Sequence, residues 1–169
     1  MKLTDLILGE LDREAPLTRR ALDAVPEGRD GWKPHARSMP LGRLADLVAM
    51  MPAWLTMIVE KDELDVSPPP GAKSQFQREL TTRTERARVL DEGVAGARKA
   101  LGSTSDDHLM KPWRLLAGGK VVAEQPRYVM LQDSINHLAH HRGQLTVYLR
   151  LNEQPVPAIY GPSADDKRF

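Results

Sequence analysis

Three of the five histidines of this chain gather in the segment NHLAHHRGQLTVYLR, residues 136–150. His137 and His141 are four residues apart, so on a helix their imidazoles share one face, one turn apart. Two imidazoles in this arrangement can bind the same divalent ion, such as Zn²⁺ or Ni²⁺. A catalytic zinc ion usually has three protein ligands and one open position, so this pair predicts only part of a metal site.

The helix that must position this pair is predicted over residues 126–151, with Pro126 near its first turn. His137 and His141 border the apolar stripe of this helix, whereas His140 points away from it, toward solvent or a partner subunit. Other residues share the side of His137 and are predicted either to line a pocket there or to belong to the core. These residues are Met130, Ser134 and Tyr148.

Three further helices are predicted from apolar residues that recur every three to four positions, over residues 2–25, 41–61 and 75–101. Pro52 predicts a bend in the second of them, and Ser74 is the predicted N-cap of the third. The pair Gly118 and Gly119, between two apolar dipeptides, predicts a small hairpin before the last helix. We therefore expect one all-α domain over residues 1–169, built as a four-helix bundle with that hairpin.

The composition argues against several classes of function. Lys and Arg number 24 and Asp and Glu 23, so a net charge of +1 provides no field that attracts nucleic acid or an anionic membrane. The absence of cysteine excludes disulfides, thiolate ligands and a thiol nucleophile. The first residues, MKLTDLILGELDRE, do not resemble a signal peptide, and no stretch approaches the ~20 apolar residues of a membrane span. We expect a cytoplasmic protein.

Several segments together resemble one known family. HLAHHRGQLTVYLRL and PVPAIYGPSADD resemble the C-terminal signature of the DinB family, which includes metalloenzymes similar to bacillithiol transferases. SMPLGRLA, MPAW and PWRLLAGG agree with the same pattern, which covers nearly the whole chain. The resemblance implies an antiparallel four-helix bundle of the DinB/YfiT-like type, frequent homodimers, and a divalent metal held by three histidines. Two of these histidines correspond to His137 and His141.

The third metal ligand that the resemblance implies is a histidine of the second helix, and this position is Leu47 here. A leucine side chain cannot bind a metal. Asp46 is its neighbour, but one residue turns a helical side chain by about 100°, so Asp46 would substitute only in a rotated or distorted helix. Leu47 instead extends an apolar strip with Met51 and Trp54. We therefore expect metal binding, by zinc or nickel, to be weak or absent.

Two hypotheses of function follow. The first is a metal-dependent enzyme resembling thiol (S-)transferases, which would use a low-molecular-weight thiol, with His137 and His141 as ligands and an incomplete histidine triad. The sequence assigns no catalytic residue to it. The second is a metal-free, non-catalytic DinB-like protein that binds a small ligand or acts as a stress-related interaction protein. In both, the expected pocket contains Leu47, Met51, Trp54, Met130, Ser134 and Tyr148, and neither nucleic acid nor a membrane is a partner.

One charged residue lies inside the apolar stripe of the last helix. Arg142 falls among the leucines, although a guanidinium does not lose its proton in proteins. The sequence predicts that it reaches solvent or pairs with a carboxylate, for which Asp165 and Asp166 are candidates, or that it binds a substrate anion.

Overall fold

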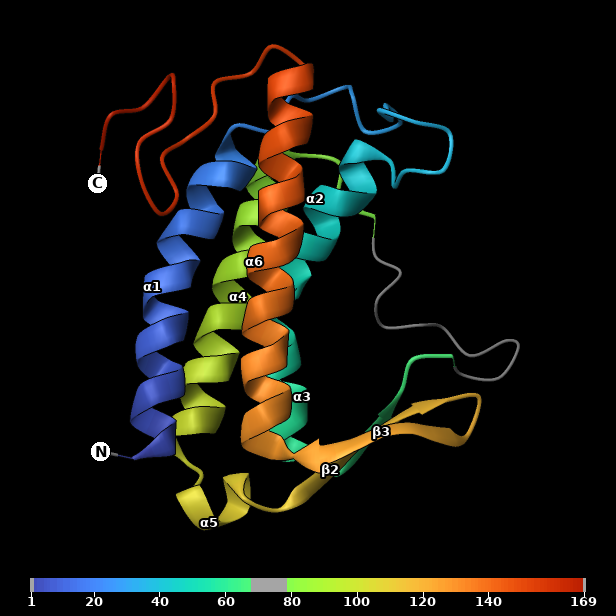
Figure 1. Cartoon of the computed structure of the whole chain (residues 1–169), viewed down its shortest axis with the longest axis vertical. Helices are drawn as coiled ribbons and strands as arrows, with labels where there is room; N and C mark the ends of the chain where they lie inside the picture. The colour runs from blue at the N-terminus through green and yellow to red at the C-terminus, as the bar shows by residue number, and fades with distance from the viewer. Residues whose placement is uncertain (1, 68–78, 169) are drawn as a thin grey trace.

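The arrangement of elements is known for residues 2–67 and 79–168, which the computed structural model describes. Helices α1, α4 and α6 and the consecutive helices α2 and α3 run side by side, and a small sheet lies at one end of them (Figure 1). The elements are α1 (Leu3–Asp23), α2 (Leu41–Met50), α3 (Pro52–Glu60), β1 (Glu63–Asp65), α4 (Arg83–Gly102), α5 (Asp106–Leu109), β2 (Pro112–Ala117), β3 (Lys120–Pro126) and α6 (Arg127–Leu151).

The expected all-α four-helix bundle is wrong, because the described residues form six helices and a mixed sheet of three strands. The predicted hairpin is present as β2 and β3, and its turn residues Gly118 and Gly119 have φ values of 60° and 76°, which favour glycine. The unexpected strand is β1, which pairs in parallel with β2. Its three residues, ELD, have no alternating pattern, so only their pairing with a distant segment makes them a strand.

Two polar side chains fix the sheet in place. Asp65, at the end of β1, accepts hydrogen bonds from the turn amides of Gly118 and Gly119 at 3.0 and 2.7 Å. Arg127, at the start of α6, is buried and donates to the carbonyl oxygen of Pro112 at 2.8 Å. It also pairs with Asp62, just before β1. The sheet is therefore anchored to the beginning of the helix that carries the histidines.

The predicted bend at Pro52 is confirmed, because α2 ends at Met50, α3 begins at Pro52 and the two axes differ by 45°. Pro52 has no amide hydrogen, so it cannot continue the hydrogen-bond ladder of α2 and instead starts a new helix. Within the described residues, no single helix is long and apolar enough to cross a membrane, although the bent pair α2 and α3 reaches that length and composition when taken together.

Helix α4 begins later than predicted. The expected start at Gln75 and the N-cap Ser74 lie outside the described residues, and residues 79–82 are not helical. Thr82 is the observed N-cap, because its hydroxyl accepts a hydrogen bond from the amide of Glu85 at 3.2 Å, and the Glu85 carboxylate accepts one from the Thr82 amide at 3.1 Å. This reciprocal capping box satisfies amides that the first turn leaves without helical partners.

The buried core contains an ion pair of Arg142 whose carboxylate is not one of the two that were predicted. Arg142 is 1% exposed and donates a hydrogen bond to the carboxylate of Glu14 in α1 at 2.5 Å, and not to Asp165 or Asp166. Its guanidinium also donates to the hydroxyls of Thr18 and Tyr160, at 3.0 and 2.7 Å. The two aspartates instead pair with exposed arginines of the helix end and the tail. Arg142 therefore has a structural role that joins α1, α6 and the C-terminal segment.

Candidate functional site

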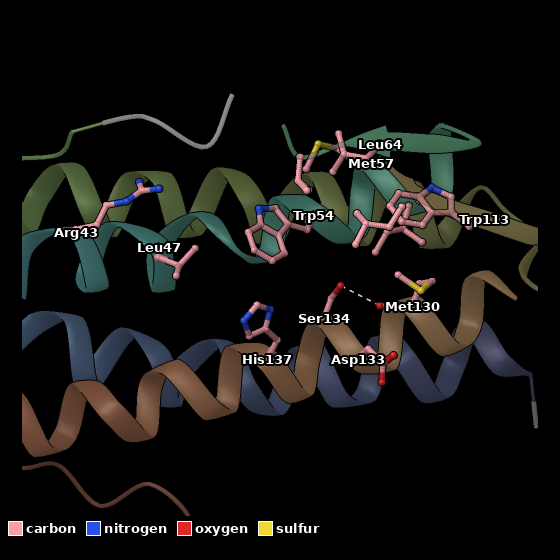
Figure 2. A pocket seen from close by; sticks show the side chains of 13 residues that line it. Arg43, Leu47, Trp54, Met57, Leu64, Trp113, Met130, Asp133, Ser134 and His137 are labelled. Atoms are coloured by element: carbon pink, nitrogen blue, oxygen red, sulfur yellow. Dashed lines mark hydrogen bonds between the residues drawn. The ribbon is translucent and has the colours of Figure 1, made fainter. Parts of the chain in front are cut away.

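A pocket of about 380 Å³ lies between the α2–α3 pair, the first half of α6 and the sheet (Figure 2). Its walls are almost entirely apolar, and Leu47 and Trp54 stand on the wall opposite His137. The lining residues are Arg43, Leu47, Trp54, Met57, Ile58, Leu64, Val66, Trp113, Leu115, Met130, Asp133, Ser134 and His137. This volume and lining are typical of small-molecule sites in proteins.

One part of this pocket is formed by residues of α2, α3 and α6 that the spacing in the sequence brings to the same side of their helices. Four residues of the expected pocket, Leu47, Trp54, Met130 and Ser134, line it together with His137. The two other residues predicted there lie elsewhere: Met51 is fully buried in the core, at the break between α2 and α3. Tyr148 is farther along α6, where its hydroxyl donates to the carbonyl oxygen of Met39 at 3.1 Å and its ring packs edge-on against Trp32.

The other half of the pocket comes from the sheet and from α3. Leu64 and Val66, in and just after β1, and Trp113 and Leu115, in β2, form a wall that the sequence did not predict. These residues reach α6 only because β1 pairs with β2 next to the helices, which is a contact between distant segments. Met57, Ile58, Arg43 and Asp133 were also missed, although they follow the helical spacing of the predicted members.

The histidines form a continuous chain of hydrogen bonds on the surface of α6. The Nε2 atoms of His137 and His141 are 2.8 Å apart, and the two rings are 4.5 Å apart between centroids. His141 Nδ1 lies 2.8 Å from the amide oxygen of Gln144. The amide nitrogen of Gln144 lies 3.0 Å from His140 Nε2. The third histidine is thus exposed, as predicted, but it is connected to the pair through Gln144.

The chemistry of the Gln144 amide fixes the direction of the two hydrogen bonds that Gln144 makes with His141 and His140. An amide oxygen only accepts, so His141 donates to it from Nδ1, and an amide nitrogen only donates, so His140 accepts on Nε2. The two Nε2 atoms of His137 and His141 share one proton, and which of them donates it depends on the tautomers of the two rings. Partial burial, followed by the neighbouring His141 and His140, lowers the pKa of His137 below its ordinary value, which favours the neutral form of the His137 ring at pH 7.

The residues around the pair do not complete a tight metal site. Leu47 stands where the resemblance implies a third ligand, and Asp46 is directed elsewhere. The carboxylate of Asp46 accepts hydrogen bonds from the Leu80 amide at 3.1 Å and from Arg86 Nε at 2.8 Å. Burial raises the pKa of Asp46, and the hydrogen bonds from Arg86 and Leu80 oppose that rise. Among residues 2–67 and 79–168, no three His, Cys, Asp or Glu side chains are placed to share an ion.

Comparisons with known proteins agree with this fold. The family model described as the DinB family matches residues 4–168. A crystal structure of a DinB-like protein from Bacillus cereus ATCC 10987 superposes with a TM-score of 0.69, at 22% identity, over 91% of this chain and 95% of that one. A DinB-like protein of Bacillus subtilis, YjoA, gives a TM-score of 0.65, at 16% identity, over 88% and 92%.

The sequence similarity to one curated protein covers a much shorter part of the chain than the structural similarities do. The uncharacterized protein YrdA of Bacillus subtilis strain 168 is 42% identical over 43 residues, which is 25% of this chain and 26% of that protein. The chain thus matches only about a quarter of the length of this relative.

Proposed function

Since this chain belongs to the DinB family, we propose that it binds a small, largely apolar ligand in the pocket between α2–α3, α6 and the sheet, without a tightly held metal ion. The observation that carries this proposal is the place of Leu47, which lines the same pocket as His137. A hydrocarbon side chain at this position cannot coordinate a metal ion. It also adds apolar surface that a bound small molecule can cover.

Other features of the pocket support ligand binding. Its apolar wall is built from side chains of three helices and two strands, and Trp54 and Trp113 add aromatic surface. The ring of Trp54 lies 5.7 Å from that of His137, so an aromatic wall and a polar group meet at one point. Apolar and aromatic walls give a site affinity for a small molecule, and a few polar groups fix the orientation of that molecule in the site.

Ligand-observed NMR with 3-phenyl-1-propanol tests this proposal. We expect saturable binding with a Kd on the order of 0.1–1 mM, since the probe has few atoms. Leu47→Trp fills the pocket and should weaken binding by about tenfold or more, because the probe loses its apolar contacts. Leu6→Trp is the matched control, because Leu6 is an exposed leucine of α1 outside the pocket, and it should bind as the wild type does. Unsaturable binding, or equal binding by both variants, would contradict the proposal.

A second candidate function is metal-dependent transfer of a low-molecular-weight thiol, as in the enzymes that the family resemblance suggests. The observation in its favour is the short distance of 2.8 Å between the two Nε2 atoms, since an ion could replace the proton that they share. In this case His137 and His141 would hold the ion, whose chemistry would be Lewis-acid activation of the thiol. The two imidazoles alone do not fit a tight site, so this candidate ranks second.

A further inference from the structure

Aromatic rings and thioethers gather at the end of the pocket next to the sheet. Trp54 and Met57 come from α3, Trp113 from β2 and Met130 from α6. Figure 2 shows Trp54 and Trp113 on the upper wall and Met130 below Trp113 on the lower wall. Trp54, Met57 and Met130 are only partly buried, so each keeps surface that a ligand can touch. Three separate elements therefore bring polarisable side chains to one end of the cavity.

The same end of the pocket lacks charged side chains in the described part of the chain. Two of the lining residues carry a full charge, Arg43 and Asp133. Arg43 lies at the opposite end, beyond Leu47, and the carboxylate of Asp133 is directed away from the cavity (Figure 2). A charged group buried next to the sheet would lose its hydration without gaining a partner, which costs free energy. The part of a ligand that enters this end is therefore uncharged.

We propose that the ligand carries an uncharged aromatic ring, and that this ring occupies the sheet end of the pocket, between Trp54, Trp113 and Met130. This inference rests on the proposed function, because it assigns the chemical class of the ligand in the same pocket. Aromatic rings attract one another in offset or edge-to-face contacts beyond the effect of the area that they bury. Thioether sulfur also packs favourably against ring edges. A saturated ring of the same size has neither interaction.

Two alcohols that differ only in their ring test the inference, 3-phenyl-1-propanol and 3-cyclohexyl-1-propanol. The cyclohexyl ring is the more hydrophobic of the two, so burial of apolar surface alone predicts that the cyclohexyl compound binds more tightly. We expect the reverse, with a Kd for the phenyl compound that is lower by about twofold or more, because only its ring interacts with the indoles and thioethers. Ligand-observed NMR titrations of both compounds measure this ratio.

Two variants of the wall test which side chains cause the preference. Trp54→Leu keeps an apolar side chain but removes one ring, so the ratio should shift by about fivefold toward the cyclohexyl compound. Met130→Leu nearly conserves volume and removes one thioether, so a shift of about twofold is expected. Trp32→Leu is the matched control, because Trp32 packs against Tyr148 outside the pocket, and it should keep the wild-type ratio.

The outcomes separate this inference from the proposed function. Tighter binding of the cyclohexyl compound to the wild type would overturn the aromatic preference while the pocket remains a ligand site. An unchanged ratio in both Trp54→Leu and Met130→Leu would overturn it as well, because the preference would then arise elsewhere. If neither alcohol binds saturably, the proposed function itself fails.

Discussion

Leu47→His should raise the affinity for Zn²⁺ by on the order of 100-fold or more, because it adds the third imidazole that a tight site requires. Leu47 and His137 stand on opposite walls of the same pocket, so an imidazole at position 47 would enter the cavity that His137 also lines (Figure 2). A competition assay with a coloured zinc chelator, at fixed pH and without buffer anions that bind zinc, measures the change.

Two controls make the result specific. Leu47→Ala removes the same leucine without adding a ligand, so its zinc affinity should stay close to that of the wild type. Leu47→His combined with His137→Ala should lose the gain, since the new ligand acts together with the existing pair. An affinity of Leu47→His equal to that of Leu47→Ala would show that position 47 is not the third-ligand position.

Glu14→Ala should destabilise the protein by about 3–5 kcal/mol, because it leaves the guanidinium of Arg142 buried without its carboxylate. Both side chains are at most 2% exposed, and the Glu14 carboxylate also accepts the hydroxyl proton of Tyr160 at 2.8 Å. The free energy of unfolding in urea measures this loss.

Glu10→Ala is the matched control for that loss. Glu10 is on the same helix and pairs with Arg13 at 2.5 Å, but both side chains are at least 36% exposed. Exposed pairs contribute about 0–1 kcal/mol, so this variant should stay near the wild type. Similar losses in the two variants would mean that the Arg142 pair has no special role in stability.

Strong local signals in the sequence predicted their elements well. The helix with the histidines was predicted over residues 126–151 and is observed as Arg127–Leu151, since a long periodic stripe bounded by prolines leaves few alternatives. The Gly118 and Gly119 turn was also predicted, because both residues require positive φ. Strand β1 was not, since its three residues become a strand only through a partner about 50 positions away in the chain.

The site was predicted to the extent that one helix face determines it. The α6 residues around His137 follow from spacing alone, but the sheet wall of Trp113 and Leu115 depends on how distant segments pack. The partner of Arg142 was missed for the same reason, because Glu14 looks like an ordinary polar residue of α1. Gln144 was missed although a signal was present: it stands three and four residues after His141 and His140, where it can reach both.

The metal content of the purified, tag-free protein tests most directly whether Leu47, at the position of the third ligand, prevents tight metal binding. Elemental analysis would follow dialysis against micromolar zinc and nickel, with His137→Ala treated in parallel. We expect well under one ion per chain in both proteins, because two imidazoles and a leucine do not form a tight site. About one ion per chain in the wild type, lost in His137→Ala, would contradict the metal-free pocket and favour metal-dependent thiol transfer.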